Sequence, residues 1–317
     1  MSIQSENEYE DLLGQWSDLE SGLGVILSNS ANAQEFVKRV VQYDRWMQSL
    51  MQHDPDVGLY LLFQLASNSP VGYSASHALV CATLCHVIAT ELFIDRKERD
   101  SLVRAALTMN IAMTTLQDAL ANQVEKPDVA QQTAIRAHAI KGSMMLTNLG
   151  VADDLWIEIV ASHHEDTADK DDWRQVAPVT RLARILRVVD RYAAMISPRL
   201  SRAGRTATES ARSVMANASA TSDEIGHAMV KAVGLCPPGT FVRLDNDDLA
   251  VVVRRSTAAN QPFVAIVGHA TGELLPAPHL HSTAQGPPRI RTALAASAVR
   301  ARLNHFHLMQ LGARARQ

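Results

Sequence analysis

The chain has 317 residues, of which 47% are hydrophobic and 20% are charged, and its formal net charge is −3. This composition indicates a globular protein with a sizeable core, and it excludes the strongly basic field of most nucleic-acid-binding proteins. Three cysteines and an acidic N-terminus without an apolar signal segment favour reduced thiols and a cytoplasmic location. No run of about 18 uncharged apolar residues occurs, so we expect no membrane-spanning segment.

Helical periodicity extends from about residue 8 to residue 232, with apolar residues recurring at spacings of three and four. The predicted helices cover residues 33–52, 56–67, 74–93, 96–120, 128–148, 153–164, 178–196 and 205–233. Pro127 and Asp128 form a start signal, the stretch Asn148-Leu149-Gly150 forms a stop signal, and Asp153 is a candidate N-cap. The fold class is therefore mainly α.

The pattern changes at residues 234–240, GLCPPGT, after which short β-branched runs replace the helical spacing. The segment FVRLDNDDLAVVVRRS has an Asn-Asp turn between two such runs and predicts a β-hairpin, and QPFVAIVGHATGELL predicts a second pair of strands. The end of the chain is basic and broken by Pro and Gly, with one helix expected near residues 289–311.

These patterns divide the chain into four regions. They are an N-terminal helical region at 1–68, a helical domain at 69–233, a small β extension at 234–280 and a basic C-terminal tail at 281–317. The first region is interpreted as a helical cap or dimerisation element. The tail is interpreted as a solvated terminal helix, with contact to nucleic acid or an acidic partner as the alternative.

One predicted helix carries His77, Cys81 and Cys85 at intervals of four residues, so all three lie on one helix face. A metal site with two cysteines is one interpretation of this stripe. A core role is favoured for the cysteines, because small buried cysteines usually act as packing residues. His77 is the more informative candidate ligand, because it is the first residue of this stripe.

Three further places carry polar side chains in apolar surroundings. His138 lies in the middle of a predicted helix, while His163 and His164 are adjacent at a predicted helix end, where both rings can turn towards one metal ion. Asp190 lies on an apolar helix face, where a carboxylate needs a cation or hydrogen-bond donors. The alternatives are a core histidine at position 138, two polar residues at a frayed helix end for the adjacent pair, and an ion pair of Asp190 with Arg187 or Arg191.

The order of these residues resembles the HD superfamily of metal-dependent phosphohydrolases, and more narrowly its HD-GYP branch, bacterial enzymes that hydrolyse cyclic di-GMP. The resemblance extends from about residue 70 to about residue 255 and rests on SASHALVCATLCHVIATEL, HAIKGSMMLTNLG, VASHHED, ARILRVVDRYAAMISPR and VGLCPPGTFVRLDNDDLAVVVRR. It implies an HD-type helical bundle with a small C-terminal β-hairpin extension. It also implies the metal ligands His77, His138, His163, His164 and Asp190.

The sequence departs from the family at the catalytic His-Asp pair and the lysine that follows it. Met109 occupies the histidine position, Asn110 the aspartate position and Met113 the lysine position, and residues 166–177 lack the Gly-Tyr-Pro motif. In the family the aspartate bridges two metal ions. Two divalent ions about 3.5 Å apart repel by roughly 19 kcal/mol at an effective dielectric constant of 20, so losing an anionic bridge weakens a two-metal site.

The remaining ligands divide into two sets. His77 and Asp190 alone make a poor site, whereas His138, His163 and His164 with water can form a mononuclear site for one divalent zinc, iron or manganese ion. The alternative is that no metal is bound. The resemblance also places Arg199 and Arg202 at positions that contact phosphate in the family, with a solvated basic turn as the alternative.

Our interpretation is a degenerate HD-GYP-like signalling protein, an impaired or inactive relative of cyclic di-GMP phosphodiesterases. It would bind cyclic di-GMP or a related phosphoester, a protein partner or a second copy of itself. The alternative is an active metal-dependent phosphohydrolase with an altered metal site. A third hypothesis is an interaction module that works through its N-terminal helices and basic tail. We expect neither a membrane nor a nucleic-acid partner.

Overall fold

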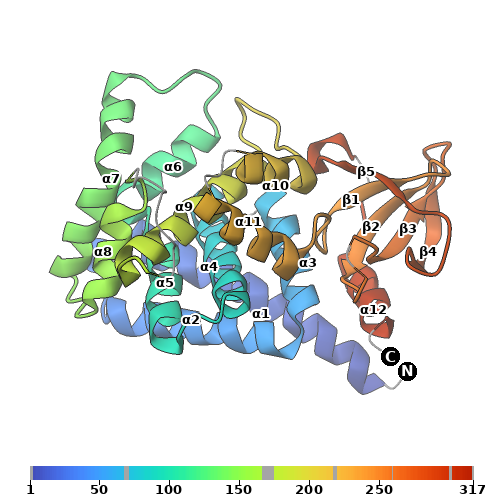
Figure 1. The fold of residues 1–317 in the computed structure, drawn as a ribbon, viewed down its shortest axis with the longest axis horizontal. Helices are drawn as coiled ribbons and strands as arrows, with labels where there is room; N and C mark the ends of the chain where they lie inside the picture. The colour runs from blue at the N-terminus through green and yellow to red at the C-terminus, as the bar shows by residue number, and fades with distance from the viewer. Residues whose placement is uncertain are drawn as a thin grey trace.

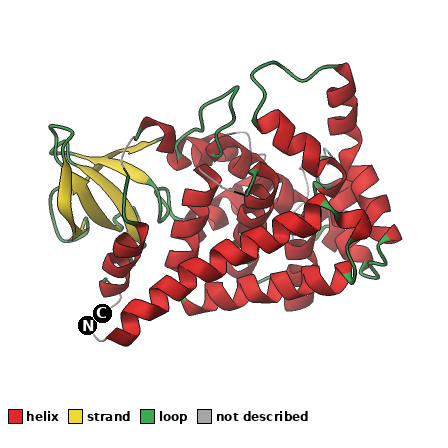
Figure 2. Cartoon of the chain, turned by 180° about the vertical axis from the view of Figure 1, so that it is seen from behind, coloured by secondary structure: helices red, strands yellow, loops and turns green. Residues whose placement is uncertain are grey.

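The computed structural model describes residues 3–67, 71–165, 175–216, 220–258, 260–299 and 302–315. A helical body carries a five-stranded antiparallel sheet at one end, and the two chain ends lie close together beside that sheet (Figures 1 and 2). The predicted fold class, mainly α with a C-terminal β unit, is confirmed. The β unit is larger than the hairpin extension that the sequence suggested.

Eleven α-helices build the described part of the body. They are α1 (Ile3–Ser28), α2 (Phe36–His53), α3 (Pro55–Ser67), α4 (Tyr73–Glu91), α5 (Arg96–Thr108), α6 (Thr114–Ala121), α7 (Val129–Asn148), α8 (Asp154–Ser162), α9 (Pro178–Ile196), α10 (Ala207–Ala216) and α11 (Ala220–Val233). Two predicted helices are divided. Residues 96–120 form α5, a 3-10 turn at Ile111–Met113 and α6, and residues 205–233 form α10 and α11.

Capping residues fix the ends of the two helices that carry the histidines. Asp128 accepts a hydrogen bond from the Gln131 amide, and the Gln131 side chain accepts one from the Asp128 amide, so α7 begins with a capping box. Gly150 has φ +82° just beyond the end of α7, a conformation that favours glycine. Asp153 caps α8 by accepting from the Trp156 amide. The start and stop signals predicted at these positions are confirmed.

Helix α4 is the central element of the body. It packs against α1, α3, α5, α9 and α11, and Figure 1 shows it surrounded by helices. By length and composition α4 could cross a membrane, but 78% of its apolar window is buried inside the protein, as in a core helix. Its position places His77, with only 2% of its surface exposed, in the interior.

The N-terminal helices share one continuous hydrophobic core with the rest of the chain. On α2, Asp44 is completely buried and accepts a hydrogen bond from Arg104 on α5 at 3.0 Å. Burial raises the pKa of Asp44, and hydrogen bonds from Gln48 and Arg104 oppose that effect. The boundary predicted at residue 68 therefore falls inside a region of shared packing.

The sheet contains β1 (Phe241–Leu244), β2 (Leu249–Arg254), β3 (Phe263–Gly268), β4 (Leu274–Ser282) and β5 (Ile290–Leu294) in the order β4-β3-β2-β1-β5. The predicted hairpin and the second pair of strands are confirmed as β1–β2 and β3–β4. Along β2 the side chains alternate between two layers. Val251 and Val253 join the main core, and Val252 joins a smaller cluster on the opposite face.

The prediction of a helix near residues 289–311 is wrong over the first part of this range. Residues 290–294 form β5, which pairs with β1, and a 3-10 turn at Ala296–Ala298 follows. Among the described residues of the C-terminal segment, α12 (His305–Arg314) is the α-helical part. Ile and Thr in this segment suit a strand, and an open sheet edge offers backbone partners that local helical propensity does not reveal. The sheet thus continues beyond residue 280, where the sequence placed its end.

A buried ion-pair cluster joins the sheet to the helical body. Arg254, the last residue of β2, is 7% exposed and donates to Asp56 at 3.1 Å and also to Asp54 and to the Gly312 carbonyl. Asp54 in turn accepts the amides that begin α3, so one carboxylate caps a helix and binds the guanidinium. We call Asp54, Asp56 and Arg254 the docking cluster.

Candidate metal centre

Three of the predicted metal ligands lie together at one end of the helical body. His138 comes from the middle of α7, while His163 and His164 directly follow α8, and their ligand nitrogens lie within 4.8 Å of one another. The ring centroid of His138 lies 5.3 Å from that of His163 and 5.0 Å from that of His164. We call these residues the three-histidine group. Because α8 ends at Ser162, the two adjacent rings can face the same point.

Backbone hydrogen bonds determine which nitrogen of each buried ring carries the proton. His138 Nδ1 lies 2.5 Å from the Ile135 carbonyl oxygen, and His163 Nδ1 lies 2.7 Å from the Val160 carbonyl oxygen. A carbonyl only accepts hydrogen bonds, so both Nδ1 atoms carry hydrogen and both Nε2 atoms of the neutral rings are bare acceptors. These two Nε2 atoms lie 3.3 Å apart. Two facing lone pairs repel each other, and a cation held between them would relieve that repulsion.

Burial also keeps these rings neutral. His163 is 1% exposed, and burial together with the charge of His164 lowers its pKa to about 4. Burial likewise lowers the pKa of His138. Metal ions bind imidazole in its neutral form, so both rings are in the protonation state that a ligand needs.

The spacing of the ring nitrogens fits a divalent ion. With zinc–nitrogen bonds of about 2.0–2.1 Å and tetrahedral angles, two ligand nitrogens lie about 3.3 Å apart. The observed separation between the Nε2 atoms of His138 and His163 is 3.3 Å. His164 is exposed and closes the group on its solvent side, which leaves room for water as a further ligand.

A second group surrounds the first predicted ligand. His77 Nε2 lies 2.9 Å from Asp190 Oδ1 and 3.7 Å from Cys81 Sγ, and the ligand atoms of these three residues lie within 4.8 Å of one another. We call them the His77 group. Burial would raise the pKa of Asp190, but the hydrogen bond and charge of His77, with the charges of His163 and His164, lower it to about 2. Asp190 is therefore a carboxylate.

The two groups are neighbours. Asp190 lies on α9, which packs against both α4 and α8, and its charge acts on the pKa values of His138 and His163. Among the described residues, the ion-pair partner of Asp190 is His77 and not a neighbouring arginine. Asp190 is bonded to His77, and Arg187 donates to the Glu165 carbonyl instead.

Met109, Asn110 and Met113 lie where α5 ends and the 3-10 turn at Ile111–Met113 begins. Met109 is 1% exposed, and the turn packs against α7, which carries His138. A thioether and a neutral amide add no negative charge. Among the candidate ligands of the two described groups, Asp190 is therefore the single carboxylate.

The two predicted phosphate-binding arginines occupy different surroundings. Arg199 lies over the ring of Tyr73, 4.8 Å from its centroid, and donates to its hydroxyl at 3.0 Å. Tyr73 stacks on His77 with an interplanar angle of 14°. Arg202 is exposed and donates to the Ala194 carbonyl. The structure thus connects Arg199 to the His77 group through Tyr73, and backbone hydrogen bonds hold Arg202 beside Arg199.

Sequence reasoning missed Tyr73, and the core position that it favoured for Cys81 agrees with the complete burial of this side chain. Tyr73 precedes His77 by four residues and Cys81 follows it by four, so both lie on the helix face that His77 uses. This spacing of four residues is the sequence signal that places Tyr73 and Cys81 beside His77. Most of residues 166–177, where the sequence predicts an exposed loop without the Gly-Tyr-Pro motif, lie outside the described part of the chain.

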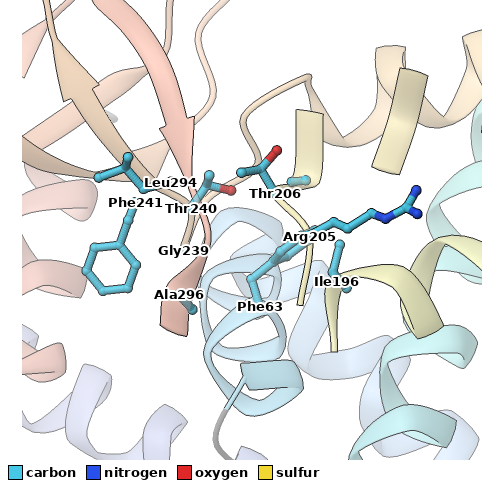
Figure 3. A pocket seen from close by; sticks show the side chains of 10 residues that line it. Phe63, Ile196, Arg205, Thr206, Gly239, Thr240, Phe241, Leu294 and Ala296 are labelled. Carbon is cyan, nitrogen blue, oxygen red and sulfur yellow. The ribbon is translucent and has the colours of Figure 1, made fainter. Parts of the chain in front are cut away.

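A small cavity of about 30 Å³ lies where the helical body meets the sheet, lined by Phe63, Ile196, Thr240 and Leu294 among others (Figure 3). It is large enough for about one water molecule. The Thr240 hydroxyl is buried there without a hydrogen-bond partner among the described residues. None of the residues that line this cavity belongs to either candidate metal group.

Comparison with known proteins relates the helical body to a domain family. A sequence model of the HD domain matches residues 61–224, about half of the chain, and this range includes every member of both groups. The chain is 28% identical over 189 residues to a protein named cyclic di-GMP phosphodiesterase from Pseudomonas aeruginosa. That match covers 58% of this chain and 45% of the relative, so the chain spans less than half of the relative's length.

Proposed function

Because this chain belongs to the HD domain family, we propose that it binds a divalent metal ion at the three-histidine group and recognises cyclic di-GMP or a related phosphoester with weak or absent hydrolysis. One observation carries the proposal. The bare Nε2 atoms of His138 and His163 face each other 3.3 Å apart, at the separation that a bound ion requires. The ion would be zinc, iron or manganese.

The chain's own residues prepare this site before any ion binds. The carbonyls of Ile135 and Val160 fix the two rings in one tautomer, and burial keeps the rings neutral. When bound, a metal ion supplies a water of lowered pKa and positive charge near a phosphate. His164, on the exposed side, would complete the ligand set and leave that water accessible.

Weak hydrolysis follows from the residue at position 110. The branch of the family that the chain resembles uses an aspartate there to bridge two ions, and Asn110 is neutral. Met113 also replaces a lysine that would add positive charge near the phosphate. Without the aspartate, no carboxylate bridges two ions that would share a hydroxide. Without the lysine, the negative charge of the phosphate is only partly neutralised.

Recognition of the phosphoester is assigned to the basic residues after α9. Arg199 and Arg202 can donate paired hydrogen bonds to phosphate oxygens. The name of the Pseudomonas relative supports cyclic di-GMP as the ligand to test first. A protein that binds this nucleotide without turnover would act as a cytoplasmic regulator, through a protein partner or a second copy of the chain.

A second candidate is an active phosphohydrolase with an altered metal site. It is favoured by the close placement of the His77 group and the three-histidine group, since two adjacent ligand sets can hold two ions. Turnover of cyclic di-GMP separates this candidate from the first.

The test measures metal content and cyclic di-GMP hydrolysis on one preparation loaded with Fe(II) or Mn(II). We expect about one ion per chain, no steady turnover, and loss of the ion in His163→Gln. The matched control is His86→Gln, because His86 is a partly buried histidine outside both groups. Two ions with steady turnover would favour the active candidate, and an equal metal content in His163→Gln and the wild type would contradict the three-histidine site.

A further inference from the structure

The sulfur of Cys81 lies among ligand atoms and not only among apolar side chains. Cys81 is completely buried one helical turn after His77, and its Sγ lies 3.7 Å from His77 Nε2. That nitrogen lies 2.9 Å from Asp190 Oδ1, so one nitrogen, one sulfur and one carboxylate oxygen converge. The opposite ring nitrogen, His77 Nδ1, is buried without a partner among the described residues, so His77 presents Nε2 to this group.

The separations are close to those around a tetrahedral zinc ion. Bonds of about 2.3 Å to sulfur and 2.0–2.2 Å to nitrogen and oxygen place sulfur about 3.6 Å from nitrogen, and nitrogen about 3.4 Å from oxygen. The observed values are 3.7 Å between Cys81 Sγ and His77 Nε2, and 2.9 Å between His77 Nε2 and Asp190 Oδ1. The shorter distance is that of a hydrogen bond, in which a proton occupies the space that an ion would take. A widening of about half an ångström admits the ion.

We infer that Cys81 is a metal ligand, and that His77, Cys81 and Asp190 form a second site for a soft divalent ion of the zinc type. The inference rests on the proposed metal-binding function and extends it to a second position. Ion binding releases the Cys81 thiol proton to solvent, and the single ring proton of His77 moves from Nε2, where it faces Asp190, to Nδ1. The site then holds a thiolate, a carboxylate and a neutral imidazole.

The charge of this ligand set explains why a bridging carboxylate is not needed. A thiolate and a carboxylate together carry two negative charges, which balance one divalent ion inside the group. Sulfur ligands favour zinc over manganese and magnesium, so the second position has a different metal preference from an oxygen-bridged pair. The neutral residue at position 110 then prevents a bridge between ions without preventing binding at this position.

The chain supplies matched controls for the sulfur. Cys85 lies on the same helix one turn further on, is equally buried, and is not a member of the group. Cys236 is half-buried on a different segment, where its sulfur lies 3.5 Å from the Thr208 hydroxyl. These are the other two cysteines of the chain.

The test is titration of the metal-free full chain with Co(II), a spectroscopic substitute for zinc. Two signals are followed. Visible d–d absorption reports cobalt in a tetrahedral site, and near-ultraviolet charge transfer reports a cobalt–thiolate bond. We expect both signals in the wild type, with about two cobalt ions per chain. Cys81→Ser loses the charge-transfer band and about one ion, whereas Cys85→Ser and Cys236→Ser keep both.

The outcomes distinguish this inference from the proposed function. Wild-type protein that shows d–d absorption without charge transfer overturns Cys81 as a ligand and leaves the three-histidine site intact. A charge-transfer band that survives Cys81→Ser overturns it equally. If His163→Gln changes neither signal, the three-histidine site fails while the His77 group stands. Should Cys81→Ser not fold, the Cys85→Ser/Cys236→Ser double variant keeps Cys81 as its single thiol and must retain the band.

Discussion

The Nε2 atoms of His138 and His163 lie 3.3 Å apart, and each ring donates its Nδ1 proton to the helix carbonyl three residues earlier, Ile135 in α7 and Val160 in α8. The orientation of both rings therefore comes from helix backbone and not from carboxylate side chains. A helix backbone is a rigid partner, so the two nitrogens are held at their separation before an ion arrives. Four testable consequences of this architecture follow from four different parts of the chain.

Removing metal should lower thermal stability through the three-histidine group. A ligand present at about one hundred times its dissociation constant stabilises the folded state by about 2.7 kcal/mol, which corresponds to a rise in Tm of roughly 5 °C for a chain of this size. Thermal unfolding with saturating Zn(II) and with excess chelator measures the difference. We expect His138→Gln to reduce the rise clearly, because one of the two buried Nε2 ligands is gone. His86→Gln should retain the full rise, and an equal shift in both variants would contradict the assignment.

Restoring the missing anion should restore the second hard-metal position. In Met109→His/Asn110→Asp, a carboxylate replaces an isosteric amide where α5 ends, and we expect the Fe(II) or Mn(II) content to rise from about one ion to about two per chain. Hydrolysis of cyclic di-GMP should become measurable. The control is Met109→Leu/Asn110→Ala, which changes the same positions without adding a ligand. Unchanged metal stoichiometry in the first variant would count against the family alignment of these residues.

The two arginines after α9 should contribute differently to nucleotide binding. A charge-assisted hydrogen bond contributes about 1.5–3 kcal/mol, so Arg202→Ala should weaken the binding of cyclic di-GMP by roughly tenfold to a hundredfold. Arg199→Ala should lose at least as much, because Arg199 also holds Tyr73 against His77. Calorimetric titration measures both, with Arg191→Ala, an exposed arginine on α9, as the control. Affinity unchanged in both arginine variants would place the phosphate elsewhere.

The metal-free chain should become less stable as the pH is lowered, and His86 should account for part of this loss. Burial, with the nearby charge of Arg99, lowers the pKa of His86 to about 4. Between pH 6.5 and pH 4 the unfolded chain binds a proton at this residue that the folded chain does not. The unfolding free energy contributed by His86 is therefore complete above pH 6.5 and is lost as the pH falls towards 4, by about 1–3 kcal/mol for a partly buried ring.

Urea unfolding in the presence of chelator at pH 7.5 and pH 4.5 tests this contribution. The loss of stability between the two pH values should be smaller in His86→Gln than in the wild type. His269→Gln, which changes an exposed histidine, should lose as much as the wild type. Equal pH dependence in all three proteins would show that His86 is solvated in solution.

The helices and the candidate ligands could be predicted because their signals are local. Capping residues and a spacing of three to four mark α7 and α8, and an adjacent histidine pair at a helix end is visible in one line of sequence. The division of the ligands into His77 with Asp190 and the three histidines was also anticipated, and the structure places these residues in two such groups. Their metal binding stays a prediction.

What escaped prediction depends on distant parts of the chain. β5 is a strand because β1 offers it a free edge more than forty residues earlier, which no local pattern at residues 290–294 records. The nearness of Cys81 to Asp190 depends on how α4 crosses α9, and the sequence alone gave only the helix face. A buried cysteine looks the same in sequence whether its neighbours are leucines or ligand atoms.

The docking cluster has a consequence for how the sheet can move. Tilting the sheet away from α3 would separate Arg254 from two buried carboxylates, at a cost of several kcal/mol for the uncompensated charges. Gly312 lets α12 pack closely on β2, since a methyl group at this position would approach the Val253 carbonyl oxygen to 2.8 Å. The ion pairs therefore favour a single attached position of the sheet, and undocking the sheet would require both carboxylate contacts of Arg254 to be lost together.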